Sequence, residues 1–169
     1  MNDAASSLPA IGQPLADFFL PATGGRTFRL ADLRGQSVVL YFYPKDNTPG
    51  CTTEAAQFRD LYAEFVKCGA TVWGISRDSL KAHENFKAKL GLPFELLSDA
   101  DETVCRLFGV IKMKNLYGKP VRGIERSTFL IDKQGRLARA WRNVKADGHA
   151  AAVLEAVKSL CPSSARENQ

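Results

Sequence analysis

The chain has 169 residues, of which 45% are hydrophobic and 24% charged, and its formal net charge is +5. This length and composition predict one globular domain with a sizeable core, and no stretch is long and apolar enough to span a membrane. The basic residues are scattered among acidic ones instead of clustering with aromatic side chains, which argues against a nucleic-acid-binding surface.

The chain begins with residues 1–12, which carry no periodic pattern and which we predict to be a flexible lead-in to a single domain over residues 13–161. This segment lacks the basic stretch and the apolar run of a secretory signal, so we expect a cytoplasmic protein whose thiols are kept reduced. The first predicted elements are two strands, residues 17–20 and 27–30, which form a β-hairpin around Gly24-Gly25.

A buried strand is predicted over residues 38–43, because all six residues are β-branched, aromatic or aliphatic and Pro44 stops the run. A polar connector follows. Thr48 is then a natural helix N-cap and Pro49 a natural first helical residue. From Cys51 onward, apolar side chains recur at helical spacing: Ala55, Phe58, Leu61, Tyr62, Phe65 and Val66.

Extended and helical patterns alternate through the rest of the chain, which indicates an α/β domain with a mixed sheet. The predicted elements are a strand over 70–76, a helix from Asp78 or Ser79 to Leu90 that ends at Gly91, a short strand and turn over 94–99, a helix over 102–108, a hairpin of strands 126–132 and 136–142, and a helix from Gly148. The lysine-containing stretch 111–119 predicts a solvated loop, and residues 162–169 a disordered tail.

Cys51 stands three residues past the predicted cap, where unpaired backbone N–H groups and the positive end of the helix dipole favour an anion. A cysteine at this position is expected to be partly thiolate at neutral pH and to act as a nucleophile. The alternative is an inert, small hydrophobic residue of the core, as most cysteines are. Prolines, a glycine, threonines and a charged loop surround Cys51, and these neighbours favour the reactive thiol.

The stretch of residues 41–54, Y-F-Y-P-K-D-N-T-P-G-C-T-T-E, resembles the active-site segment of the peroxiredoxins. The family motif P-x-x-x-T/S-x-x-C is matched by Pro44, Thr48 and Cys51. The form of the motif is similar to that of the subfamily called peroxiredoxin Q, or bacterioferritin comigratory protein.

A second block, residues 123–132, is similar to the family's strand that carries the active-site arginine, here Arg126. The resemblance covers nearly the whole chain. It implies a thioredoxin-like fold, with a mixed central sheet, flanking helices and an N-terminal β-hairpin extension.

The resemblance also implies thiol-dependent reduction of hydrogen peroxide and organic hydroperoxides through a sulfenic acid at Cys51, with no metal or other cofactor. Arg126 would offer fixed cationic donors to the thiolate, or would otherwise be a surface residue entering a strand. The Thr48 hydroxyl would donate to the peroxide or to the sulfur, and its oxygen would cap the helix. Pro44, which has no N–H, would shape the pocket. Glu54 would hold Arg126 by an ion pair, unless its carboxylate faces water.

Relatives of this type carry a resolving cysteine five residues after the peroxidatic one or on the following helix. Here the two positions hold Ala56 and Lys87. We therefore expect a one-cysteine mechanism in which an external thiol reductant (thioredoxin, glutaredoxin or glutathione) completes the cycle, in a monomer or weak homodimer.

The other three cysteines are judged by their positions. Cys68 lies near the far end of the predicted helix, ~25 Å from Cys51 and outside disulfide reach. Cys105 has apolar neighbours and is most simply a core residue that could act as a resolving cysteine only after local unfolding. Cys161 lies near the C-terminus, from where it could reach Cys51 of its own or a neighbouring chain, so it is the reserve candidate for resolution.

Two other function classes remain open on the sequence. One is a redox sensor in which oxidation of Cys51 alters a surface. The other is thioredoxin-like disulfide exchange, which normally uses a C-x-x-C pair. None of the four cysteines forms such a pair, since Thr48 and Glu54 stand three residues before and after Cys51.

Overall fold

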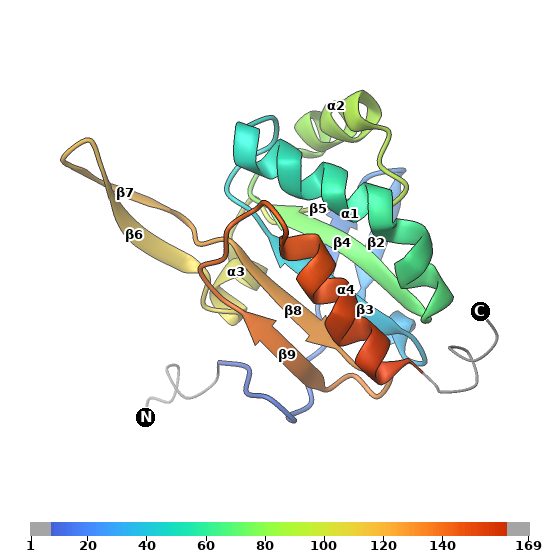
Figure 1. The fold of residues 1–169 in the computed structure, drawn as a ribbon. Helices are drawn as coiled ribbons and strands as arrows, with labels where there is room; N and C mark the ends of the chain where they lie inside the picture. The colour runs from blue at the N-terminus through green and yellow to red at the C-terminus, as the bar shows by residue number, and fades with distance from the viewer. Residues whose placement is uncertain (1–7, 162–169) are drawn as a thin grey trace, which may run out of the picture.

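A seven-stranded mixed β-sheet forms the centre of the computed structural model, which describes residues 8–161 (Figure 1). The strands of this sheet are β1 (Phe19–Ala22), β2 (Arg26–Arg29), β3 (Ser37–Phe42), β4 (Ala70–Ser76), β5 (Leu96–Ser98), β8 (Ser127–Ile131) and β9 (Leu137–Trp141). A separate hairpin consists of β6 (Ile111–Leu116) and β7 (Lys119–Ile124). The helices are α1 (Pro49–Lys67), α2 (Leu80–Leu90), α3 (Thr103–Leu107), α4 (His149–Leu160) and the 3-10 helix η2 (Leu30–Leu33).

The strand order in the sheet is β2-β1-β5-β4-β3-β8-β9. Strands β3, β4 and β5 are parallel, and α1 and α2 form the crossovers between them. The remaining pairs are antiparallel, with the β1–β2 hairpin at one edge and β8–β9 at the other. This topology confirms the predicted α/β class with a mixed sheet and an N-terminal hairpin.

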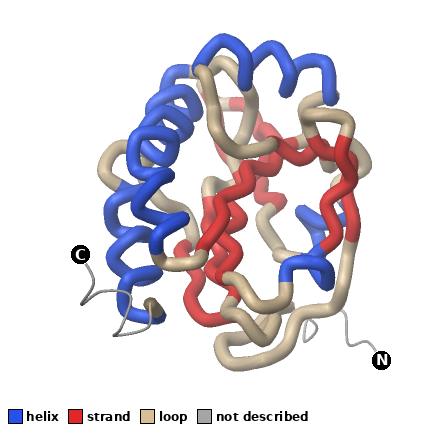
Figure 2. Tube along the Cα trace, turned by 90° about the vertical axis from the view of Figure 1, so that its right-hand side faces the viewer, coloured by secondary structure: helices blue, strands red, loops and turns tan. Residues whose placement is uncertain are grey.

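The central strand β3 is buried on both faces, as its unbroken apolar run predicts. Its alternate side chains enter two different cores: Val39 and Tyr41 pack below the helices, whereas Leu40 and Phe42 pack on the opposite face. Figures 1 and 2 show α1 and α4 lying side by side over the first face, with α2 beside α1. The short α3 contributes Val104 to the second core.

Several predicted boundaries are confirmed. β4 occupies the predicted residues 70–76, and α1 begins with Pro49 after an extended Thr48. Helix α2 follows Ser79, whose hydroxyl oxygen accepts a hydrogen bond from the Ala82 N–H at 3.2 Å, and ends at Gly91 in the left-handed conformation.

The prediction of a solvated loop over residues 111–119 is wrong, because this stretch forms β6 and the turn of an exposed hairpin. The hairpin buries almost no side chains, so the sequence lacks the apolar alternation that marks a strand. The hairpin turns at Tyr117 and Gly118, both with positive φ, and Gly118 is the residue of the sequence that could have indicated a hairpin turn here. Figure 1 shows the hairpin projecting from the body of the molecule.

Residues 1–7 and 162–169, which include most of the predicted lead-in and the whole predicted tail, lie outside the described residues. From Gly12 the chain is attached to the sheet, since the Gly12 N–H donates to the Leu137 carbonyl at 2.8 Å. Within residues 8–161, no helix has both the length and the apolar character that crossing a membrane requires.

Candidate active site

Cys51 lies at the point where β3 leads into α1. The strand ends at Phe42, the chain turns through residues 43–48, and Cys51 is the third residue of the helix. The first helical hydrogen bond joins the Thr52 N–H to the Thr48 carbonyl at 2.8 Å, so the amides of Gly50 and Cys51 precede the helical ladder. The Cys51 side chain is only 1% exposed. The predicted nucleophile therefore sits at the positive end of α1, shielded from bulk water.

A buried network fixes the loop between β3 and α1. The Tyr43 hydroxyl donates to Asp46 Oδ1 at 2.5 Å, and Asp46 Oδ2 lies 2.6 Å from His83 Nδ1 on α2. The other ring nitrogen of His83 donates to the Leu97 carbonyl at 2.8 Å. Asn47 then turns the chain with a φ of 66°, a conformation that asparagine tolerates better than most residues. These contacts anchor the loop that carries Pro44 and Thr48.

The same network contains a group of side chains, Asp46, Asp78 and His83, whose ligand atoms lie within 4.8 Å of one another. Protein groups already occupy these atoms. Both His83 nitrogens are used, and Asp78 accepts from the Asp46 N–H at 2.9 Å and from the Ser76 hydroxyl. The group therefore serves as a structural clamp between the loop and α2, and we assign no metal to it.

Arg126 reaches Cys51 because β8 pairs with β3. The strands are antiparallel, with Ser127 opposite Phe42, so the residue before β8 lies next to the start of α1. Arg126 Nη2 donates to Cys51 Sγ at 3.4 Å. Gly50 makes room for this contact, since a Cβ at that position would lie 3.1 Å from Nη2.

Glu54, one turn after Cys51, holds the guanidinium from the other side. Its Oε1 accepts from Arg126 Nη1 at 2.6 Å, and the carboxyl group is fully buried. Burial raises the pKa of Glu54 to about 7, and the Arg126 charge opposes that rise. The ion pair expected from the sequence is present, and the alternative of a carboxylate facing water is excluded.

Thr48 occupies the N-cap position, but its side chain does not cap the helix. Its hydroxyl instead donates to the Lys45 carbonyl at 2.8 Å. Two expectations are therefore wrong: the Thr48 oxygen does not bind the helix amides, and the hydroxyl proton is not directed to the sulfur or to a peroxide beside it. The Lys45 carbonyl offers the hydroxyl a competing local partner. The lone pairs of Oγ1 remain available to accept a hydrogen bond.

Two titratable residues near the site were not predicted from the sequence. His149, the first residue of α4, lies 2.8 Å from the Thr128 hydroxyl through Nε2, and burial, together with the Arg126 charge, lowers its pKa to about 4. Tyr41 stacks on Phe58 with ring centroids 4.7 Å apart. Burial and then the Glu54 charge raise the pKa of Tyr41 well above its usual value, so this phenol is neutral. No local sequence pattern predicts that the side chains of His149 and Tyr41 lie near the site.

The remaining cysteines lie away from Cys51 in the structure. Cys105 is fully buried, its N–H donates to Asp99 Oδ2 at 2.6 Å, and burial strongly raises the pKa of its thiol. Cys161 is 4% exposed and lies against Cys68 at the other end of α1. A Cys51–Cys161 disulfide within one chain would therefore require α4 to unwind.

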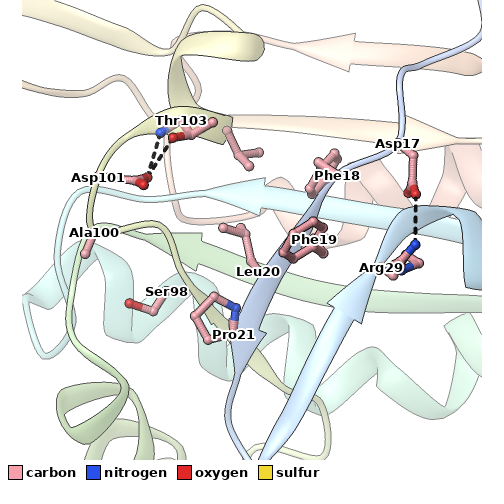
Figure 3. A pocket seen from close by; sticks show the side chains of 11 residues that line it. Asp17, Phe18, Phe19, Leu20, Pro21, Arg29, Ser98, Ala100, Asp101 and Thr103 are labelled. Atoms are coloured by element: carbon pink, nitrogen blue, oxygen red, sulfur yellow. Dashed lines mark hydrogen bonds and ion pairs between the residues drawn. The ribbon is translucent and has the colours of Figure 1, made fainter.

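Among the hollows of the described residues, one lies apart from this constellation and another borders it. One, of about 640 Å³, is lined by β1 and the chain between β5 and α3, where Asp17 and Arg29 form an ion pair at 3.8 Å (Figure 3). It contains none of the predicted site residues. A smaller hollow of about 360 Å³ is lined by Pro44, Lys45 and Arg77, among others, and it borders the loop before Cys51.

Comparison with known proteins places this geometry in context. The model of the AhpC/TSA family matches residues 11–140. Peroxiredoxin Bcp of Xanthomonas campestris is 54% identical over 161 residues, covering 94% of this chain and 98% of the relative. Peroxiredoxin Bcp of Bacillus subtilis is 49% identical over 150 residues, covering 89% and 96%.

Solved structures agree with these relatives. A peroxiredoxin Q mutant from Xylella fastidiosa has a TM-score of 0.86 at 46% identity, covering 91% of this chain and 98% of that one. The bacterioferritin comigratory protein of Xanthomonas campestris, described for its alkyl peroxide reduction activity, has a TM-score of 0.81 at 53% identity, covering 86% and 92%.

Proposed function

Since the chain belongs to the AhpC/TSA family and is, like its relatives, a peroxiredoxin with thiol-dependent peroxidase activity, we propose that Cys51 is the sulfur that attacks the peroxide. The observation that carries this proposal is the contact between Cys51 Sγ and Arg126 Nη2 at 3.4 Å, at the N-terminus of α1. A thiolate there is stabilised by the helix dipole and by a fixed cation.

The reaction is a displacement at oxygen. The Cys51 thiolate attacks one oxygen of the peroxide, the S–O bond forms, and the O–O bond breaks. The departing oxygen takes up a proton and leaves as water or as an alcohol, and Cys51 becomes a sulfenic acid. Hydrogen peroxide and organic hydroperoxides both fit this scheme, because only the peroxide bond reacts.

We assign the surrounding residues roles that follow from their contacts. Arg126 stabilises the thiolate and the negative charge that develops on the departing oxygen. Glu54 is a positioning residue that holds the guanidinium through Nη1. Thr48 Oγ1, whose proton is directed to the Lys45 carbonyl, accepts the O–H of the incoming peroxide. Pro44 lines the approach to the site without adding an N–H donor.

The cycle is completed by an external thiol in a one-cysteine mechanism. Ala56 and Lys87 carry no sulfur, and Cys105 and Cys161 are buried away from the site. The sulfenic acid therefore condenses with a thiol supplied by thioredoxin, glutaredoxin or glutathione, and a second thiol then releases the reduced enzyme.

Intact mass spectrometry after one equivalent of peroxide tests this mechanism. The expected product gains one oxygen, is trapped by dimedone at Cys51, and gains one glutathione when glutathione is added. A loss of two hydrogens with Cys51 linked to Cys105 or to Cys161 would replace the one-cysteine mechanism with a two-cysteine one. Because no internal thiol competes for the sulfenic acid, excess peroxide is also expected to produce the sulfinic acid readily.

A further inference from the structure

Cys68 and Cys161 lie against each other at the ends of two neighbouring helices. Cys68 is the C-cap of α1 and Cys161 the C-cap of α4. Both are free thiols of the same core, 5% and 4% exposed, and the nearness of Cys161 contributes to a raised pKa of Cys68. The chemistry proposed for Cys51 uses neither of them.

The packing of α1 on α4 accounts for this pairing. The two helices run side by side, and the colour gradient of Figure 1 shows that they run in the same direction. At the start of α4, the Gln57 side chain accepts from the Gly148 N–H at 2.9 Å and donates to Asp147 Oδ1 at 2.7 Å. The part of α1 that follows Gln57 advances about three turns. The 12 residues of α4 also advance about three turns. The helices therefore end together, which brings Cys68 to Cys161.

We propose that Cys68 and Cys161 are a second oxidation site of this protein, at which peroxide forms a disulfide that joins α1 to α4. One sulfur, as the thiolate, attacks the peroxide and becomes a sulfenic acid, while the O–O bond breaks and water or an alcohol leaves. The second thiol then attacks the sulfenic sulfur and releases water. Two thiols lose two electrons and two hydrogens in total, and one peroxide is reduced.

The surroundings of Cys68 affect the rate of this oxidation through the pKa of its thiol. Burial, followed by the nearby Cys161 thiol, raises the pKa of Cys68 to about 11. Lys158 on α4 lowers that pKa and Glu64 on α1 raises it. Because the thiolate is the reacting species, the raised pKa makes the Cys68 thiol react slowly at neutral pH. The site therefore responds to a sustained excess of peroxide.

The experiment uses the full-length chain with Cys51→Ser, in which the proposed peroxidatic sulfur is absent, so its result does not depend on the role of Cys51. Incubation with excess hydrogen peroxide at pH 8.5 is expected to lower the intact mass by two hydrogens per chain. A non-reducing tryptic map is expected to link Cys68 to Cys161. The denaturant midpoint should rise, because the bond closes a long loop, and should return after reduction.

Two further variants make the result specific. Cys51→Ser with Cys161→Ser is expected to lose no hydrogens, whereas Cys51→Ser with Cys105→Ser is expected to form the disulfide as the parent does. Cys51→Ala replaces Cys51→Ser as the parent if the serine variant does not fold. An unchanged mass, oxygen added to Cys68 without a link, or a link from Cys68 to any other cysteine would overturn the proposal.

Discussion

The two ends of α1 carry the same buried side chain in opposite surroundings. At the first end, Cys51 lies beside helix N–H groups and 3.4 Å from the Arg126 guanidinium. At the other end, the Cys68 N–H donates to the Phe65 carbonyl and the Gly69 N–H to the Val66 carbonyl. The Cys68 thiol lies against Cys161, and burial raises its pKa to about 11. The exposed fractions, 1% and 5%, do not distinguish the two thiols.

This difference shows that the chemistry of a cysteine in this fold depends on the charges and dipoles that face its sulfur. The N-terminal end of a helix favours an anion, whereas the C-terminal end presents carbonyl oxygens that disfavour one. We therefore expect the N-terminal thiol to react with peroxide first and the C-terminal thiol to remain reduced until peroxide is in excess.

Removing the sulfur at each end gives the largest expected contrast. Cys51→Ser should remove the fast peroxide turnover and leave only the slow oxidation of Cys68 and Cys161, because a serine hydroxyl is not ionised at neutral pH. Cys68→Ser should keep the wild-type rate. Both are measured as peroxide consumption in the presence of a thiol reductant. Turnover near the wild-type rate in Cys51→Ser would show that another residue carries the reaction.

Arg126→Ala should lower the rate of Cys51 oxidation by roughly 10²–10³-fold, as the loss of a preorganised donor does in other enzymes. Arg126→Lys should restore little of this loss, since an ammonium cannot reproduce the fixed fork of donors that contacts Sγ and Glu54. Single-turnover oxidation followed by mass measures the rate. Arg122→Ala, which removes an arginine paired with Glu102 outside the site, is the matched control and should oxidise normally. Equal rates for the two alanine variants would remove Arg126 from the mechanism.

The stability of the Cys51 end should depend on pH through two groups with opposite signs. The pKa of Glu54 is raised from 4.5 to about 7, so the folded state loses stability as pH rises from 4.5 to 7, by about 3 kcal/mol in all. The pKa of His149 is lowered from 6.5 to about 4, so the folded state gains stability as pH rises from 4 to 6.5.

The two opposing pH dependences of stability overlap, so a variant that lacks one titrating group should reveal the effect of the other group. Relative to the wild type, Glu54→Gln should make the urea midpoint rise more steeply between pH 4.5 and 6.5, and His149→Gln should make it fall. Cys68→Ser, at the other end of α1, should follow the wild-type curve over this range. Parallel curves for all four proteins would mean that neither group titrates as described.

Alanine substitutions at two glycines, Gly50 and Gly69, have the smallest expected effects on rate and stability. Gly50→Ala places a Cβ 3.1 Å from Arg126 Nη2, so it should slow oxidation by about tenfold. Stability should be kept or slightly raised, because alanine loses less backbone entropy on folding than glycine does. Gly69→Ala puts a Cβ on a residue with a φ of 71°, so it should cost about 1 kcal/mol and leave the rate unchanged. Urea unfolding and single-turnover rates on both variants test this; a slower Gly69→Ala would contradict it.

How far the sequence could predict this site depends on the distance along the chain over which each contact is made. Pro44, Thr48 and Cys51 lie within one strand–loop–helix unit, and its pattern fixes where α1 begins. The contact of Arg126 depends on pairing β8 with β3, across 75 residues, and only the family resemblance pointed to it. The local pattern therefore predicts the backbone around Cys51, whereas the pairing of β8 with β3 adds Arg126 to the site.

Other features were not accessible to sequence reasoning for specific physical reasons. The rotation of the Thr48 hydroxyl is decided by the competing Lys45 carbonyl. Burial of His83 against Asp46 requires α2 to pack on the loop. The contact of Cys161 with Cys68 requires α4 to lie parallel to α1, whereas the sequence placed Cys161 only near a chain end.

The projecting β6–β7 hairpin makes this protein convenient for labelling and immobilisation. Its chain leaves and re-enters the body through the paired residues Ile111 and Ile124, and the turn residue Tyr117 is 96% exposed. Exposed turns of this kind tolerate insertions best. A fluorophore or an affinity tag between Tyr117 and Gly118 would attach to the molecule through a segment whose side chains are almost all exposed.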